Sequence, residues 1–585
     1  MGAMPHAKGV HFRVWAPNAR EVRVIGSFNQ WNERKASTLH KENNGYWSGN
    51  VAKAKPGDEY KYLIITQDNR RLRRNDPYAR AVTHSAGNSI IYDPNAFNWE
   101  GDSFTLPPHN ELVIYELHVG TFNAPGNGKM GTFCTAIERL PYLKKLGINA
   151  VEVMPAAEFA GDLSWGYNPA LPFAIESTYG GPNAFKDFVK ACHRFGIGVI
   201  MDVVYNHFGP SDLDLWQFDG WQENNLGGIY FYNDWRAQTP WGHTRPDYGR
   251  SEVRQYIRDN AMMWLEECHC DGLRMDMTPY IRNVYADENP SNDLKEGYEL
   301  IRWINGEIAA KYPDKITIAE DLHGMDFITR EVAAGGCGYT TQWDADFVHP
   351  VRDVLTVIYD GDRDMEKVRH ALMRTYNNDA FQRVIYTESH DEVANGKARL
   401  PEEISNGNVN NYYAKKRTVL GAALMMTAPG IPMVFQGQPL LEDKWFSDTD
   451  PIDWNRLKEF RGIFQLFRDL IRLRRNLDGK TPGLTGQFTQ VLHLDYEEKI
   501  IAYTRWSKAD QSDRIVVILN FRDRSHESFN IPFPAPGTWK LLFNSDDKKY
   551  DKEFLGFQAG DVKPNEQLIG NVCIASYVAL IYALE

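Results

Sequence analysis

A chain of 585 residues is too long for a single hydrophobic core, so about two to four domains are expected. Hydrophobic residues make up 43% and charged residues 24%, the balance of an ordinary globular protein. The net charge of −12 argues against nucleic acid or a membrane surface as a partner, because binding phosphate groups requires clustered Lys and Arg.

Six cysteines are too few for a disulfide framework in a chain of this length. Cys268-His269-Cys270 resembles a fragment of a metal site, but its spacing is not that of a zinc site and no second pair follows. We therefore expect no metal and no cofactor. The N-terminus lacks the basic and apolar regions of a secretion signal, and no apolar run is long enough for a bilayer. We expect a cytoplasmic protein with reduced thiols.

Both ends of the chain have the pattern of all-β domains. In residues 1–94, short runs of alternating polarity such as EVRVIGSFNQW and DEYKYLIIT are separated by Pro, Gly and Asn. Residues 480–585 repeat this pattern with KIIAYTRW and RIVVILNF. We expect a β-sandwich at each end, with a domain of another kind over residues 95–479.

The middle of the chain alternates short apolar runs with segments that have helical periodicity, such as 184–196 and 252–269. Eight such runs are expected to be strands: 112–120, 150–155, 198–207, 272–276, 316–321, 340–344, 384–391 and 432–437. Eight βα repeats predict an α/β fold, the (β/α)₈ or TIM barrel. An open doubly wound sheet is the alternative, but no G-x-G-x-x-G follows the first strand.

One connection in this region, residues 206–250, is unusually long and rich in aromatic residues, which include Trp216, Trp235 and Trp241. Such a long loop inside a compact barrel is usually functional. It could equally be a small subdomain with its own aromatic core. The two interpretations are compatible, since a subdomain could form a wall of a cleft.

Polar residues gather at or just past the ends of the expected strands three, four, five and seven. They are Asp202, His207, Arg274, Asp276, Glu320, His390 and Asp391. The C-terminal ends of barrel strands converge on the face that carries the active site. A single acid there would indicate a structural salt bridge, but four acids with an arginine and two histidines indicate a catalytic pocket.

This set of residues suits the cleavage of a glycosidic bond, which requires two carboxyl groups on either side of the bond. One must be protonated and the other ionised, and neighbouring carboxylates push their pKa values apart. Arg274 lies two residues before Asp276, so both side chains point to the same face of the strand. We expect the guanidinium to keep Asp276 ionised, as a nucleophile requires.

Four motifs in this order resemble the signature regions of glycoside hydrolase family 13, the α-amylase family. They are DVVYNH (202–207), GLRMD (272–276), AED (319–321) and SHD (389–391). The resemblance covers most of the chain. FRVWAPNA and VIGSFNQW resemble a family 48 carbohydrate-binding module, and the C-terminal strands resemble the β-sandwich usual in the family.

The resemblance implies roles for the acids. Asp276 corresponds to the nucleophile of a retaining mechanism and Glu320 to the acid/base. Asp391 corresponds to the carboxylate that binds sugar hydroxyls and stabilises the transition state. Asp202 matches an acid with a structural or site role.

The resemblance also implies a set of substrate-binding residues. His207 and His390 correspond to contacts with the sugar in the −1 subsite, Arg274 to the residue that positions the nucleophile, and Tyr167 of WGYNP to a tyrosine that stacks on the sugar. The implied partner is an α-1,4-glucan such as glycogen, amylose or a maltooligosaccharide, bound by a monomer. Asn206 is of a type that binds calcium in many amylases, but one oxygen donor does not make a site.

The family mechanism fixes the glycosyl-enzyme but leaves the acceptor open, either water or a sugar hydroxyl. SHDEVANGK (389–397) and TIAEDLHGM (317–325) resemble runs of glycogen branching enzymes, which implies transfer to a 6-hydroxyl. WGYNPALPFAIESTYGGP and DVVYNHFGP are similar to maltooligosyltrehalose trehalohydrolases, which implies a hydrolase, with an amylase as a further alternative. Met277-Thr278 and Gln438-Pro439 depart from the usual family residues.

Two other classes of protein remain. A catalytically inactive glucan-binding protein would not require the complete set of catalytic residues. A serine hydrolase could use Ser389, His390 and Asp391, but adjacent residues of a strand alternate faces and no G-x-S-x-G motif occurs.

Overall fold

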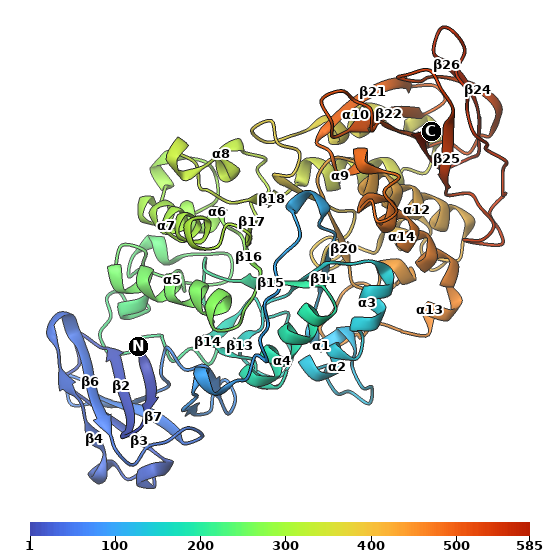
Figure 1. Cartoon of the computed structure of the whole chain (residues 1–585). Helices are drawn as coiled ribbons and strands as arrows, with labels where there is room; N and C mark the ends of the chain where they lie inside the picture. Colours follow the sequence, from blue (N-terminus) through green and yellow to red (C-terminus); the bar gives the residue numbers. More distant parts are fainter.

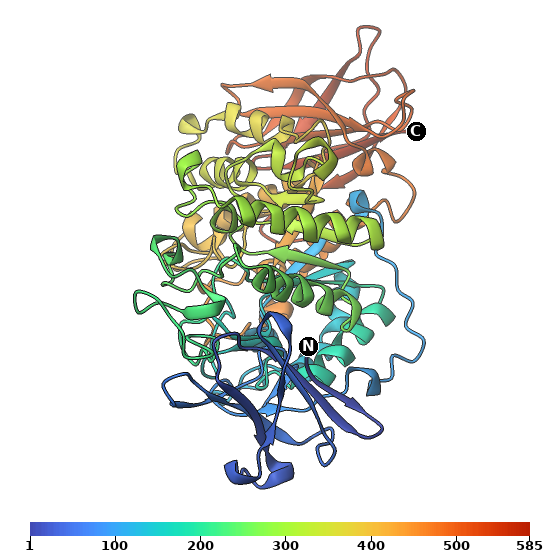
Figure 2. The same ribbon diagram turned by 90° about the vertical axis from the view of Figure 1, so that its left-hand side faces the viewer.

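The computed structural model describes residues 1–585, and its three parts follow one another along a long axis (Figures 1 and 2). The N-terminal sheets lie at one end, a barrel surrounded by helices lies in the middle, and the C-terminal sheets lie at the other end. The predicted fold class, a (β/α)₈ barrel between two all-β parts, is therefore confirmed. The domain limits at residues 94 and 479 stay a proposal.

The central sheet is a closed barrel of parallel strands, in which the last strand pairs back to the first. Its strands, in order, are β11 (Ile114–Leu117), β12 (Ala150–Val153), β15 (Gly198–Val203), β16 (Gly272–Met275), β17 (Ile316–Ala319), β18 (Thr341–Trp343), β19 (Arg383–Ile385) and β20 (Ile431–Phe435). Each overlaps one of the eight predicted runs, but the runs 112–120, 198–207 and 384–391 extend well past the ends of β11, β15 and β19. Every residue of these strands is buried, which explains why the runs are apolar throughout and do not alternate.

Helices cover the outside of the barrel (Figure 1). The two helices expected from periodicity are α4 (Gly181–Arg194) and α5 (Ser251–Glu266). In α4, Phe185, Phe188, Val189 and Cys192 recur at helical spacing and are buried against the barrel. The other helices are α1 (Val119–Phe122), α2 (Phe133–Ile137), α3 (Leu140–Leu146), α6 (Pro279–Arg282), α7 (Lys295–Lys311), α8 (Asp326–Thr329), α9 (Ala345–Thr356), α10 (Met365–Met373), α11 (Leu400–Ile404), α12 (Tyr412–Thr427), α13 (Arg456–Glu459) and α14 (Arg461–Arg474).

A hairpin of β13 (Ala157–Phe159) and β14 (Pro169–Ile175) projects between β12 and α4 and was not predicted. All residues of β14 are buried, so its sequence shows no alternation, and two prolines obscure its strand character. The turn before β14 carries Tyr167, so the hairpin places one of the predicted site residues.

The long connection, residues 206–250, contains no α-helix and only two short 3₁₀ turns, Gly228–Tyr230 and Trp235–Ala237. Phe218 and Phe231 are fully buried, so the predicted aromatic core exists. The connection also packs on the N-terminal part: Tyr230 lies edge to face with Trp15 at 5.6 Å, and Arg74 donates to the Gln217 carbonyl at 3.0 Å. It is therefore held against both the barrel and the N-terminal sheets.

The N-terminal part has one sheet in the order β1-β2-β6-β5 and a second in the order β4-β3-β7-β10-β9, with β8 paired to β7. Inward-facing Val10, Phe12 and Val14 alternate with outward-facing residues of β2, as a sandwich requires. The strands are β1 (Gly2–His6), β2 (Gly9–Trp15), β3 (Glu21–Gly26), β4 (Ser37–Thr38), β5 (His40–Lys41), β6 (Tyr46–Val51), β7 (Glu59–Ile65), β8 (Arg71–Arg74), β9 (Ala81–Val82) and β10 (Ser89–Ile90).

The C-terminal part pairs a five-stranded sheet, β21-β22-β23-β27-β25, with the two-stranded sheet β24-β26. Buried Trp539, Ile518 and Val572 belong to the core between them. The strands are β21 (Phe488–Asp495), β22 (Ile500–Trp506), β23 (Ile515–Asn520), β24 (His526–Pro532), β25 (Trp539–Asn544), β26 (Ile569–Ile574) and β27 (Ala579–Leu584).

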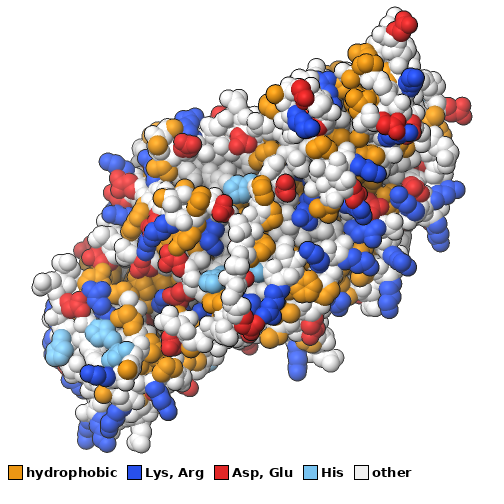
Figure 3. Space-filling model, viewed as in Figure 1, with side chains coloured by type: hydrophobic (Ala, Val, Ile, Leu, Met, Phe, Trp, Pro, Cys, Tyr) orange, Lys and Arg blue, Asp and Glu red, His pale blue; other side chains and the backbone are white.

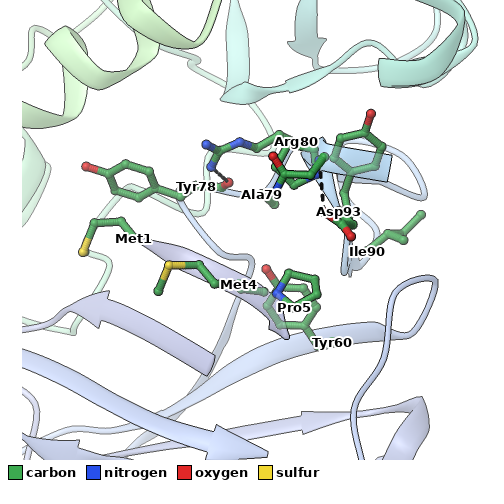
Figure 4. Close-up of a pocket in the computed structure, with 13 residues that line it drawn as sticks. Met1, Met4, Pro5, Tyr60, Tyr78, Ala79, Arg80, Ile90 and Asp93 are labelled. Carbon is green, nitrogen blue, oxygen red and sulfur yellow. Dashed lines mark hydrogen bonds between the residues drawn. The ribbon is translucent and has the colours of Figure 1, made fainter. Parts of the chain in front are cut away.

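The surface carries charges of both signs, interspersed on the face shown in Figure 3. None of the helices combines the length and the apolarity that crossing a lipid bilayer requires. A cavity of about 120 Å³ lies where β1 meets residues 78–95 (Figure 4). Arg80 donates to the Tyr78 carbonyl there at 2.8 Å. None of the strand-end acids lines this cavity, so it is separate from the site that the sequence predicts.

Candidate active site

Strand register brings the predicted acids together at the C-terminal end of the barrel. Asp202 of β15 lies directly opposite Arg274 of β16, and Arg274 lies opposite Ile318 of β17. Two residues further along these strands, Asp276 and Glu320 follow on the same face. Alternation alone therefore directs all four polar side chains into the barrel.

Arg274 is the centre of this group and is completely buried. Its Nη1 lies 2.7 Å from Asp202 Oδ2 and 3.2 Å from Asp276 Oδ1, and its Nη2 lies 2.7 Å from Glu320 Oε2. The ring of Trp343 lies 4.4 Å from the guanidinium carbon and covers one face of it. One cation thus contacts three carboxylates, which fixes their positions relative to one another.

Burial and neighbouring charges separate the pKa values of the two predicted catalytic acids. Burial raises the pKa of Asp276 to about 6, although Arg274 and Asn206 oppose this rise. Burial, with the repulsion of Asp276 and Asp391, raises the pKa of Glu320 to about 8 against the attraction of Arg274. At neutral pH Asp276 is ionised and Glu320 is protonated. Arg274 lowers the pKa of Asp276, as expected, but burial raises this pKa by more than Arg274 lowers it.

Tyr167 and His390 form the floor beside Asp202. The Tyr167 hydroxyl donates to Asp202 Oδ2 at 2.6 Å, and its ring stacks on that of His390 at 4.9 Å and 22°. Burial raises the pKa of Asp202 to about 6, and the donors Arg274 and Tyr167 limit that rise. The structure thus brings Tyr167 to the strand-end acids from the hairpin turn, although it is not on a barrel strand.

Glu116 of β11 is a member of the site that was not predicted. Its Oε2 accepts from the His390 backbone N–H at 3.0 Å, and its Oε1 lies 2.5 Å from His390 Nδ1. Burial opposes protonation of His390, but Asp391 and Glu116 outweigh it and raise the pKa of His390 to about 10. The sequence does contain a signal for Glu116, because it is an acid in the mainly apolar run LVIYELHVG. Burying an acid in such a strand is unfavourable unless it has a partner.

Glu152 of β12 lies directly opposite Glu116 and was not predicted either. Neither of its oxygens has a hydrogen-bond partner. Burial and the repulsion of Glu116 raise its pKa well above the usual range, so Glu152 is neutral. Glu152 therefore adds no negative charge beside Glu116.

Asn206 and His207 follow β15 and reach the site from its rim. The Asn206 amide donates to Asp276 Oδ2 at 2.7 Å and to the Asp276 carbonyl at 2.9 Å. Its own oxygen contacts His207 Nδ1. Burial lowers the pKa of His207 to about 4, so this imidazole is neutral, and it stacks on Trp241 at 4.5 Å and 12°. The sequence indicates Asn206 only as a calcium-ligand type; in the structure its amide holds Asp276.

Met277 follows the predicted nucleophile in a left-handed conformation, with φ of 37°. Non-glycine residues adopt this region rarely, and such strain concentrates at functional sites. The Met277 N–H donates to Glu320 Oε2 at 2.8 Å, and the Thr278 N–H donates to the Glu320 carbonyl at 3.0 Å. The departure from the family pattern at 277–278 is therefore at a turn that binds Glu320.

His390 and Asp391 do not lie on a strand, because β19 ends at Ile385 and the expected strand 384–391 continues as a loop. Asp391 is the most exposed of the predicted acids, with 45% of its side chain accessible, and its Oδ2 lies 3.5 Å from His390 Nε2. An acid that reaches outward from the loop is placed to meet a substrate from the solvent side. All eight predicted site residues thus belong to one connected group around Arg274.

A barrel whose strand ends carry one ionised and one protonated carboxyl group on a shared arginine has the architecture of glycoside-cleaving enzymes. The model for the alpha amylase catalytic domain matches residues 116–225 and 213–472. Carbohydrate-binding module 48 (isoamylase N-terminal domain) matches residues 1–79, and the alpha amylase C-terminal all-beta domain matches residues 491–585. The chain therefore belongs to the α-amylase family, glycoside hydrolase family 13, and is an enzyme of that family.

Relatives similar over most of the chain include two proteins named 1,4-alpha-glucan branching enzyme GlgB. That of Oceanobacillus iheyensis is 30% identical over 581 residues, which cover 93% of this chain and 87% of the relative. That of Pseudoalteromonas atlantica is 32% identical over 578 residues, which cover 92% and 76%.

Solved structures of the same fold include the pullulanase of Bacillus acidopullulyticus, with a TM-score of 0.78 and 21% identity over all of this chain and 74% of that one. The pullulanase of Anoxybacillus sp. LM18-11, solved with maltotetraose, has a TM-score of 0.77 and 20% identity, and covers 100% and 87%.

Proposed function

We propose that this chain is a 1,4-α-glucan branching enzyme, which cleaves an α-1,4 bond by a retaining mechanism and transfers the chain to a 6-hydroxyl. The observation that carries the chemistry is the contact of Arg274 with Asp276 and Glu320, which are ionised and protonated respectively at neutral pH. The observation that carries the acceptor is the similarity, over nearly the whole chain, to relatives named as branching enzymes.

In the first step, an Asp276 oxygen attacks the anomeric carbon while Glu320 donates its proton to the leaving glycosidic oxygen. The bond to the anomeric carbon passes from that oxygen to Asp276, and Glu320 is left as a carboxylate. Asp276 Oδ2 accepts a hydrogen bond from Asn206 at 2.7 Å and Oδ1 accepts one from Arg274 at 3.2 Å, so the carboxylate is held in a fixed orientation for the attack. The raised pKa of Glu320 makes its proton available near neutral pH.

In the second step, Glu320 removes the proton of a sugar 6-hydroxyl, and that oxygen displaces Asp276 from the anomeric carbon. The ester bond breaks, the α-1,6 bond forms, and Glu320 regains its proton. Two inversions at the same carbon retain the α configuration.

The remaining residues bind the sugar in this proposal. Protonated His390 donates to a hydroxyl group, neutral His207 contacts the sugar, Tyr167 presents its ring, and Asp391 accepts from hydroxyls and stabilises the positive charge of the transition state. Asp202 takes a structural role, because Tyr167 and Arg274 occupy its oxygens. The substrate is a neutral α-1,4-glucan, and we keep a cytoplasmic monomer as our prediction.

A hydrolase of the maltooligosyltrehalose trehalohydrolase or amylase type is the second candidate, favoured by the run WGYNPALPFAIESTYGGP that carries Tyr167. The same residues would perform the first step, and water would replace the 6-hydroxyl in the second.

Incubation with amylose separates the two. A branching enzyme lowers the absorbance of the iodine complex while few new reducing ends form, and isoamylase digestion of the product then releases short chains. Reducing ends that rise in proportion to the loss of absorbance would contradict branching, and release of trehalose from a trehalose-capped maltooligosaccharide would establish the hydrolase. The Asp276→Asn protein is the control for contaminating activity.

A further inference from the structure

Two loops on the rim of the active site expose large aromatic side chains next to each other. Trp235, in the connection after β15, is 53% exposed, and Tyr285, in the connection after β16, is 46% exposed. Their ring centroids lie 6.2 Å apart with an angle of 32° between the planes. Because both residues follow the C-terminal ends of adjacent barrel strands, the pair lies on the catalytic face of the barrel.

A continuous series of aromatic contacts connects the same two loops with the site. Trp241, which is 38% exposed, stacks on His207 at 4.5 Å, and Tyr280 lies edge to face with Trp241 at 5.3 Å. Trp241 belongs to the loop of Trp235, and Tyr280 belongs to the loop of Tyr285. The two loops therefore touch once beside His207 and once more at the exposed pair.

Arg245 holds these loops together. This side chain is completely buried, and every group that it contacts through a hydrogen bond is a backbone carbonyl. Its Nε donates to Arg236 at 2.7 Å and its Nη2 to Gln238 at 2.6 Å, both in the first loop. It also donates to Val284 at 2.7 Å and to Tyr280, both in the second loop.

The position of Arg245 is unusual because a buried guanidinium without a carboxylate is unfavourable unless its donors are used. Its role is to fix the backbone directly beside Trp235 and Tyr285. The pair is thus a rigid platform on ordered backbone, although the rings themselves face solvent. Rigid Trp and Tyr side chains that need no ordering on binding contribute a large share of binding energy at recognition surfaces.

We propose that Trp235 and Tyr285 form an aromatic platform that binds the sugar rings of a glucan chain beyond the bond that is cleaved. The apolar C–H face of a glucose ring packs on an aromatic ring, and its hydroxyls stay in water at the rim. The proposal deepens the proposed function and rests on it for the identity of the chain. It assigns these residues to the length of chain that the enzyme selects and not to the chemical steps.

Binding in the absence of turnover tests the platform directly. In a Glu320→Gln background, where the amide replaces a protonated acid, Trp235→Ala and Tyr285→Ala are titrated with maltodecaose and with maltotetraose by isothermal calorimetry. Each substitution is expected to weaken the binding of maltodecaose about fivefold or more, as truncation of a Trp or Tyr hot spot does, and to change that of maltotetraose less than about twofold. Trp303→Ala is the matched control, because Trp303 is 39% exposed on α7.

Kinetics in the otherwise unchanged enzyme give an independent readout. The two variants should raise KM for long amylose about fivefold and leave kcat within about twofold, because a platform away from the reacting atoms contributes uniform binding. Unchanged binding of maltodecaose, equal losses for both chain lengths, or the same loss in Trp303→Ala would each overturn the proposal. If wild-type protein has no activity on amylose, the proposed function fails, while the titrations still decide whether the platform binds a glucan.

Discussion

Replacing Asn206 by Ala is expected to shift the acid limb of the pH profile of kcat/KM to higher pH. The reaction needs Asp276 ionised, so activity rises as pH increases through its pKa of about 6, and it needs Glu320 protonated, so activity falls above about 8. The Asn206 amide donates to Asp276 Oδ2 at 2.7 Å and stabilises the ionised form. Without this donor, the protonated form of Asp276 is favoured and the acid limb moves upward.

The size of this shift follows from the hydrogen bond. A bond to a charged group contributes about 1.5–3 kcal/mol, and one pKa unit corresponds to about 1.4 kcal/mol. With part of that bond retained by water, the acid limb should move by about one unit, from about 6 to about 7. The ionised fraction of Asp276 then falls about twofold at pH 7 and about fivefold at pH 6.

The measurement is kcat/KM from about pH 5 to about pH 9 at constant ionic strength. Asn260→Ala is the control, because Asn260 is equally buried and bonded, to Tyr205 and Pro172, but contacts no acid of the site. The reasoning is refuted if the acid limb of Asn206→Ala stays in place, or if Asn260→Ala shifts it by the same amount. An alkaline limb that moves with the acid limb would also contradict it, since Asn206 does not contact Glu320.

Asp276→Asn and Glu320→Gln should each reduce turnover about 10⁴-fold or more while the melting temperature stays close to that of the wild type, and near-normal turnover would contradict their roles. Glu152→Gln should change kcat/KM less than about twofold, because a neutral amide replaces a neutral acid. Glu116→Gln should instead lower the pKa of His390 and reduce kcat/KM about tenfold, which NMR titration of the imidazole and steady-state kinetics would measure. If Glu152→Gln reduced kcat/KM as much as Glu116→Gln, the conclusion that Glu152 is neutral would be contradicted.

The amino-acid sequence alone is sufficient to predict the barrel and the acids at its strand ends. Strands buried on both faces are apolar runs, and because their C-terminal ends converge on one face of a barrel, Asp276 and Glu320 are expected in one pocket. The register explains why this prediction succeeds. Arg274 pairs with Ile318 on the neighbouring strand. Asp276 and Glu320 each lie two residues further along, so both side chains point into the barrel.

The residues that escaped prediction depend on pairings that lie far apart in the chain. Glu116 is bonded to a residue 274 positions later, and its neutral neighbour Glu152 is defined only by the register of β11 with β12. The sequence alone does not reveal whether an acid inside an apolar run is charged or neutral. Arg245 lies in an irregular connection without periodicity, so no pattern indicates that it joins two loops.

The proposed division of roles between the acids rests on the donors that each receives besides the shared arginine. A single guanidinium cannot balance three buried carboxylates, so burial raises the pKa of all three. Asp202 has a second donor in Tyr167 and Asp276 has one in Asn206, and both side-chain donors hold the pKa near 6. Glu320 receives only the backbone N–H of Met277 and faces the repulsion of Asp276, so it holds its proton up to about pH 8. We therefore expect Glu320, which keeps its proton at neutral pH, to act as the acid, and Asp276, which the Asn206 amide helps to keep ionised, to act as the nucleophile.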